Sequence, residues 1–314
     1  MNVRHIVTAA ALSTAVLLPI CGGSTAALAL APSLQSFIGG LPAQFDTPDA
    51  AVAAFKDALA KDDLAAIASL LGLDAAKLKT ADGISDRTAE MRTAAAKLVS
   101  LSGEGDKRII SLGTEVWPFP FPLVKNVKDG KWAFDPKAGV QEIANRRVGE
   151  NELNAIETAR LYVDAQQEYA SDDHDGDGVL EFARKLVSTP GKTDGLYWPP
   201  EQGDGDSPVG PGLDPEALDK AEAGKGYFGY RFRILERQGS NIAGGAYNYV
   251  INGHMIAGFG LVAWPIEYGR TGIMTFEINQ AGVLYERDLG PNTADIVQKI
   301  RSFNPGNSWK VAGN

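Results

Sequence analysis

The amino-acid sequence predicts an α+β fold in which helices and antiparallel strands occupy separate stretches of the chain. Helical signals come first, because Thr47 can cap a helix that carries Pro48 in its first turn. Strand-like runs follow, and Asp129-Gly130 is a dipeptide typical of a hairpin turn between them. From 137 to 170 the pattern is helical again, and the rest of the chain is mainly strand-like. The repeated order of helix and sheet predicts two domains.

The first 29 residues have the pattern of a secretory signal peptide. Arg4 precedes a short apolar run, and Ala27-Leu28-Ala29 fits the small-residue cleavage site. We therefore predict a signal peptide at 1–29 and a linker at 30–45. The protein is expected in the periplasm or secreted, without membrane insertion after cleavage. A retained anchor and a lipid on Cys21, the one cysteine of the chain, are the alternatives.

The first predicted domain covers residues 46–148. Ala51, Phe55 and Leu59 recur four apart in its first helix, a second helix ends near Gly72, and a third covers 84–97. Short strands follow within 108–136. We expect leading helices and a curled antiparallel sheet, a cone-like arrangement.

The second predicted domain covers 149–312 and begins with a long helix, in one piece or broken at Gly149. Its apolar face is expected to comprise Leu153, Ile156, Ala159 and Val163. A stretch rich in Gly, Pro and Asp, from 188 to 226, is either an ordered functional loop or a mobile one. The remainder predicts an antiparallel meander, with hairpins at 252–253 and near 280–282 and a short capped helix after 291.

The stretch "DHDGDGVLEF", residues 173–182, has the spacing of a calcium-binding loop. The expected ligands are carboxylates at alternate positions, a backbone carbonyl at the seventh position and a glutamate at the ninth: Asp173, Asp175, Asp177, Val179 and Glu181. Leu180 would be the apolar anchor, and a short helix is expected to follow. The twelfth position, which usually supplies a bidentate glutamate, is Arg184. This departure favours a structural calcium ion over a switching one, and a solvated acidic turn is the alternative.

Composition and motifs argue against several functions. The formal net charge is −9 and no basic block stands out, so nucleic acid is not an expected partner. Hydrolase, zinc and phosphate-binding motifs are not found in the sequence, and His174 and His254 are expected at the surface. We therefore expect a protein that is not an enzyme. The aromatic residues expected to face a ligand are Trp117, Tyr197, Trp198 and Trp264, with packing of a Pro-rich loop as the alternative.

Four long stretches resemble a known family. They are "WPFPFPLVK", "NRRVGENELNAIETARLYVDAQQEYA", "DHDGDGVLEFARKLVSTPGKTDGLYWP" and "GGAYNYVINGHMIAGFGLVAWPIEYGRTGIMTFEINQAGVLYERDLG". Together they resemble the secreted bacterial family catalogued as domain of unknown function 2950, over roughly residues 45–312. The resemblance implies export from a bacterium and supports the helix-then-sheet order, but it assigns no activity. More weakly, the second half is similar to the globular part of type IV pilins and pseudopilins, and the first half to nuclear-transport-factor-like domains.

Three functions are compatible with these features. The first is a non-enzymatic binding or assembly component of the envelope, whose partner is an envelope protein or a glycan and which contains structural calcium. The second is a carboxylate-based hydrolase of cell-envelope glycan, because paired acids are the machinery of glycoside hydrolysis. The third is a carrier of a small apolar ligand, with its cavity in the first domain near Trp117 and Trp132.

Overall fold

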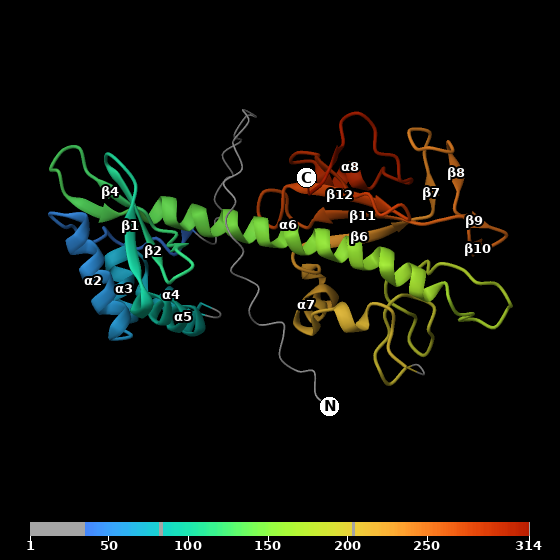
Figure 1. Cartoon of the computed structure of the whole chain (residues 1–314), viewed down its shortest axis with the longest axis horizontal. Coiled ribbons are helices and arrows are strands. Elements are labelled where there is room, and N and C mark those ends of the chain that lie inside the picture. The colour runs from blue at the N-terminus through green and yellow to red at the C-terminus, as the bar shows by residue number, and fades with distance from the viewer. Residues whose placement is uncertain (1–34, 82–83, 203–204, 314) are drawn as a thin grey trace. The chain divides into compact units, whose positions relative to one another are not determined.

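The computed structural model describes residues 35–81, 84–202 and 205–313 (Figure 1). The chain is α+β, as predicted, with helices and antiparallel sheets in two compact units that divide between Asn145 and Arg146. The predicted signal peptide, with Cys21, lies outside the described residues. Within the described ranges, no helix is both long enough and apolar enough to span a bilayer.

From Pro48 onward the first unit contains the helices α2 Pro48–Ala60, α3 Leu64–Leu71, α4 Ala75–Lys79 and α5 Ile84–Lys97. The Thr47 hydroxyl caps α2 by accepting the N–H of Ala50, and Pro48 occupies the first turn, as predicted. Gly72 ends α3 in the left-handed conformation, with φ of 67°. The three helices predicted in this region are therefore confirmed.

An antiparallel sheet follows these helices. Its strands are β1 Val99–Ser102, β2 Lys107–Leu112, β3 Trp117–Pro118, β4 Leu123–Lys125 and β5 Trp132–Phe134. They run in the order β1-β2-β4-β5, and β3 also pairs with β2. The hairpin predicted at Asp129-Gly130 connects β4 to β5, with Gly130 at φ of 71°.

Residues 35–45, the described part of the predicted linker, pair with the first unit. Ile38 forms a bridge with Leu73, and Phe45 forms one with Trp132. Both Ile38 and Phe45 pack partly buried against the unit's core. This core contains Phe55, whose ring lies 4.6 Å from that of Phe119 between ring centroids.

The helix α6, Pro136–Tyr169, is continuous for 34 residues, so Gly149 does not break it. In the second unit its buried face comprises Ala155, Ala159, Tyr162, Ala165 and Tyr169. The predicted face is therefore partly wrong, since the Leu153 side chain is 65% exposed.

The second unit's main sheet consists of five antiparallel strands in the order β14-β13-β12-β11-β6. Their bounds are β6 Tyr230–Leu235, β11 Gly260–Pro265, β12 Met274–Asn279, β13 Tyr285–Asp288 and β14 Lys310–Val311. Two short strand pairs are inserted between β6 and β11: β7 Arg237–Gln238 with β8 Tyr247–Asn248, and β9 Val250–Ile251 with β10 His254–Met255. The predicted turn at Asn252-Gly253 joins β9 to β10, and both residues have positive φ, as a type I′ turn requires.

The two short helices predicted in this unit have different outcomes. The predicted helix after the acidic stretch is wrong, because residues 179–187 are not helical. The predicted helix after Pro291 is confirmed as α8, Thr293–Val297, but the side chain of Asn292 makes no capping hydrogen bond. In the Gly- and Pro-rich stretch the described residues contain a 3-10 turn at Gly210–Gly212, α7 at Pro215–Lys220 and a π-helical turn at Ala221–Lys225.

The two faces of the main sheet have different cores. Phe276 and Ile278 of β12 belong to the large cluster beneath α6. Glu277 points the other way, as its cross-strand partner Val262 does, and Val262 packs with Val297 and Phe303. The Glu277 carboxylate accepts one hydrogen bond, from the N–H of Asn304 at 3.3 Å. Burial raises the pKa of Glu277 to about 7.

The two glycines of α6 provide a matched test of its packing in the first unit. A methyl group on Gly139 would lie 2.0 Å from Cδ1 of buried Phe121, whereas one on Gly149 would meet nothing within 4 Å. Gly139→Ala should therefore destabilise the first unit by about 1–3 kcal/mol through overpacking. Gly149→Ala should stabilise α6 by up to about 1 kcal/mol. Urea denaturation followed by circular dichroism measures both, and equal effects of the two substitutions would contradict the packing at Phe121.

The buried Glu277 predicts that the stability of the second unit depends on pH. The folded state holds the Glu277 proton up to about pH 7, whereas the unfolded state releases it near its ordinary pKa. Stability is therefore greatest at and below that ordinary pKa and falls as the pH rises towards 7, by about 3 kcal/mol from this group. Glu277→Gln should remove this loss, and the exposed control Glu201→Gln should retain it. The melting temperature of each protein is measured from pH 4 to 8. If it changes with pH in the same way for wild type and Glu277→Gln, the raised pKa of Glu277 is refuted.

Candidate functional site

The acidic loop, which we define as residues 172–181, directly follows α6. Asp173 organises the first half of this loop. Its Oδ2 accepts the N–H of Gly178 at 2.8 Å, and its Oδ1 accepts the N–H groups of Gly176 at 2.8 Å and Asp175 at 3.3 Å. Gly176 and Gly178 have φ of 77° and 87°, a backbone conformation that glycine adopts without strain. The two glycines thus allow the chain to wrap around one carboxylate.

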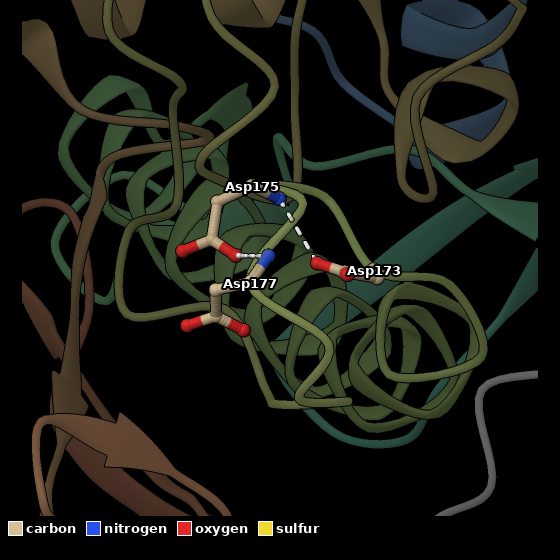
Figure 2. A group of neighbouring side chains, drawn as sticks. All are labelled: Asp173, Asp175 and Asp177. Atoms are coloured by element: carbon tan, nitrogen blue, oxygen red, sulfur yellow. Dashed lines mark hydrogen bonds between the residues drawn. The ribbon is translucent and has the colours of Figure 1, made fainter.

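The next two aspartates repeat this local bonding. Asp175 Oδ1 accepts the N–H of Asp177 at 3.3 Å, and Asp177 Oδ1 accepts the N–H of Val179 at 2.8 Å. As Figure 2 shows, the three aspartates gather at one turn of the chain. One carboxylate oxygen from each of Asp173, Asp175 and Asp177 lies within 4.8 Å of the other two. The structure thus brings the three predicted carboxylate ligands together, in an exposed position.

The electrostatics of the cluster suit a divalent cation. Hydrogen bonds from the backbone N–H groups of Gly178 and Gly176 lower the pKa of Asp173. Negative charges this close repel one another, and hard cations such as Ca²⁺ prefer carboxylate oxygens. The residues of the loop therefore fit a calcium ion in donor type, although three carboxylates supply only part of its usual six to eight oxygens.

The two later positions of the predicted ligand set have other partners. Glu181 is not part of the carboxylate cluster. Its Oε2 instead accepts the N–H of Met255 at 2.9 Å. Arg184, at the twelfth position, pairs with Glu236, with 2.8 Å between Nε and Oε1. The arginine charge is thus directed to a carboxylate outside the loop. Leu180 is 56% exposed and does not act as the predicted apolar anchor.

Both histidines are half-buried and contact neighbouring residues. His254 Nδ1 lies 3.5 Å from Asp177 Oδ2 and 3.6 Å from Glu181 Oε2, so this residue of β10 faces the acidic loop. His174 stacks on Tyr169 with 3.9 Å between ring centroids, and its Nε2 lies 3.0 Å from the Tyr169 carbonyl oxygen. These contacts join the loop to α6 on one side and to the β9–β10 hairpin on the other.

A polar cavity of about 410 Å³ adjoins the acidic loop. Five carboxylates are among the residues that line it: Asp172, Asp175, Glu181, Asp194 and Glu236. Desolvation acts to raise the pKa of Asp194, but hydrogen bonds from Lys185 and Thr189 outweigh it and lower that pKa to about 2. Asp194 is therefore a fixed negative charge. Glu277, whose pKa is raised to about 7, does not line this cavity.

A second cavity, of about 340 Å³, is mainly apolar and lies between α6, the segment 186–227 and strands β6 and β11. Its lining includes two of the aromatic residues expected to face a ligand, Tyr197 and Trp264. The other two do not share it. Trp198 is only 5% exposed and belongs to the core, so its predicted exposure is wrong. Trp117 lies in the first unit, where its ring packs edge-on against Phe119 at 6.5 Å.

A buried polar residue that was not predicted from the sequence supports the acidic loop. The Gln166 side chain of α6 is fully buried, and its Oε1 accepts the N–H of Ala183 at 2.8 Å. Its Nε2 donates to the Ala183 carbonyl at 2.8 Å and to the Tyr162 hydroxyl at 3.1 Å. The signal available in the sequence was an amide four residues after Tyr162, on what proves to be the buried face of α6.

The fold and the site together define a two-unit α+β protein with a carboxylate loop at the end of a long helix. The chain belongs to the family described as "Protein of unknown function (DUF2950)", which matches residues 43–312. This match confirms the resemblance seen in the sequence. Searches of curated proteins and of solved structures gave no significant match.

Proposed function

We propose that the protein is an exported component of the bacterial envelope that binds a partner rather than catalysing a reaction, and that calcium holds its acidic loop in place. The observation that carries this proposal is the clustering of Asp173, Asp175 and Asp177 in a loop that lies near His254 and is followed by Ala183, whose N–H donates to Gln166. Bound calcium would remove the repulsion among these carboxylates. It would supply no chemistry beyond coordination and charge neutralisation.

The chain's own residues prepare this site. Backbone N–H groups of the loop already fix the Asp173 carboxylate, so little ordering remains when a cation binds. Asp177 and Glu181 both lie near His254, so the loop and the β9–β10 hairpin are held next to each other. A fixed loop and hairpin present a constant surface to a partner, which supports binding as the function.

A carboxylate-based hydrolase of envelope glycan is the second candidate, favoured by the five carboxylates around the polar cavity. The third candidate, a carrier of a small apolar ligand, would hold its ligand in a different unit from the one predicted. We expected its cavity near Trp117 and Trp132, but Trp132 is only 6% exposed and the apolar cavity described above lies in the second unit. Release of reducing sugar from purified cell-wall glycan by the wild-type protein, abolished in Glu181→Gln, would favour the hydrolase over a binding protein.

The calcium site predicts a cation-dependent melting temperature. A ligand that binds only the folded state adds about 2.7 kcal/mol at a hundredfold excess over Kd. Saturating calcium should then raise the melting temperature of the second unit by roughly 5–10 °C. The double substitution Asp175→Asn and Asp177→Asn keeps oxygen acceptors for the N–H groups of the turn but removes two charges, and should abolish the increase.

A matched control removes the same two charges elsewhere in the unit. Asp219 and Asp295 are exposed residues of α7 and α8, and their replacement by Asn should leave the calcium effect intact. Scanning calorimetry with calcium and with chelator gives both comparisons. Equal melting temperatures of the wild type in calcium and in chelator would exclude the site.

A further inference from the structure

One edge of strand β6 carries backbone groups that have no partner among the described residues. Within that part of the chain β6 is an end strand of the main sheet, and β11 is its one neighbouring strand (Figure 1). Tyr230 lies opposite Pro265, and its N–H and carbonyl instead exchange hydrogen bonds with Tyr227, at 3.0 and 2.9 Å. The backbone groups of Tyr230 therefore point away from β11. Tyr230 and Pro265 therefore form a non-hydrogen-bonded pair of the antiparallel ladder.

Backbone direction alternates along a strand, so the groups of Phe232 and Ile234 also point away from β11. In the described part of the chain, neither residue has a hydrogen-bond partner on this side. Two N–H groups and two carbonyls thus form an open ladder. Such an edge is a template for another strand.

The side chains next to this ladder differ between the two faces of the sheet. Phe232 and Ile234 pack partly buried against the large core, and Phe232 lines the apolar cavity of about 340 Å³. Arg231 and Arg233 alternate with these two residues along the strand, and Arg231 is also among the residues that line this cavity. The Arg233 guanidinium donates to the carbonyls of Val297 and Ile300 at 2.7 and 2.6 Å. Arg231 is exposed, and within the described residues it makes no ion pair.

We propose that the β6 edge binds an extended peptide segment of a partner protein, added as a further strand, in which apolar and acidic residues alternate. The open ladder selects peptide backbone, because an extended chain repeats its N–H and carbonyl groups at the spacing of β6. The apolar side chains would enter the cavity beside Phe232, and the acidic ones would face Arg231. This inference rests on the proposed binding function and names the class of its partner.

A second copy of the chain is a poorer occupant of the same edge. Two β6 strands paired edge to edge would place Arg231 and Arg233 of both copies on the same face, and like charges on adjacent strands are destabilising. Charge complementarity therefore favours an acidic peptide.

The test uses two capped eight-residue peptides. One alternates valine with glutamate, and the comparison peptide alternates valine with lysine. Binding of the first peptide should slow hydrogen exchange of the Phe232 and Ile234 amides at least tenfold. The amides of Arg231 and Arg233 already face β11 in the ladder and should not change. This pattern would not arise from general stabilisation of the unit.

A charge exchange tests the acidic preference. The Arg231→Glu variant should bind the valine–glutamate peptide at least tenfold more weakly than the wild type does. It should bind the valine–lysine peptide more tightly than the wild type does. Arg287→Glu is the matched control, because Arg287 is exposed and its cross-strand neighbour Thr275 lies on the same face of the sheet as Glu277. This control should bind both peptides as the wild type does.

Three results would overturn the proposal. The first is unchanged exchange of the Phe232 and Ile234 amides with saturating peptide. The second is equal affinity of the Arg231→Glu variant and the wild type for both peptides. The third is protection of the Phe232 and Ile234 amides that rises with protein concentration alone, which would indicate that a second copy of the chain binds the edge. If the calcium-dependent stability persists in any of these cases, the proposed function survives and only the β6 edge is excluded as its site.

Discussion

The geometry of the site depends on the buried Gln166 amide. Its side chain bonds to both backbone groups of Ala183 and, through the Tyr162 hydroxyl, is linked to the Gly260 carbonyl of β11. The chain after the acidic loop is thereby fixed to the helix before it and to the sheet. Hydrogen bonds in so dry an environment are costly to lose, since each unpaired group would retain its full desolvation penalty. The exposed carboxylates are therefore placed by a buried and fully bonded polar group.

The second unit contains two distinct candidate regions. The acidic loop and the β9–β10 hairpin form a polar region around His254, where the carboxylates are suited to a cation. The apolar cavity and the β6 edge lie elsewhere along the sheet and offer backbone groups and Arg231. In this account the cation stabilises the unit, while the sheet edge recognises the partner.

Local signals allowed much of the fold and part of the site to be predicted. Caps, glycines and dipeptide turns predicted α2, α3 and the Asn252-Gly253 hairpin, because these depend on a few adjacent residues. The three aspartates were predicted for the same reason. The roles of Glu181, Arg184 and His254 depend on contacts between residues over 50 positions apart, such as Arg184 with Glu236. The buried face of α6 was mispredicted because its alanines are weaker hydrophobic signals than the exposed Leu153.

Residue-resolved hydrogen exchange across the acidic loop, with calcium and with chelator, tests this account most directly. The Ala183 amide is held by Gln166 and should exchange slowly in both conditions. The amides of Gly176, Gly178 and Val179 bond to exposed carboxylates, so they should exchange faster than Ala183 in chelator and should become slower when calcium is present. The account would be contradicted if calcium left these three amides unchanged, or if Ala183 exchanged as fast as they do.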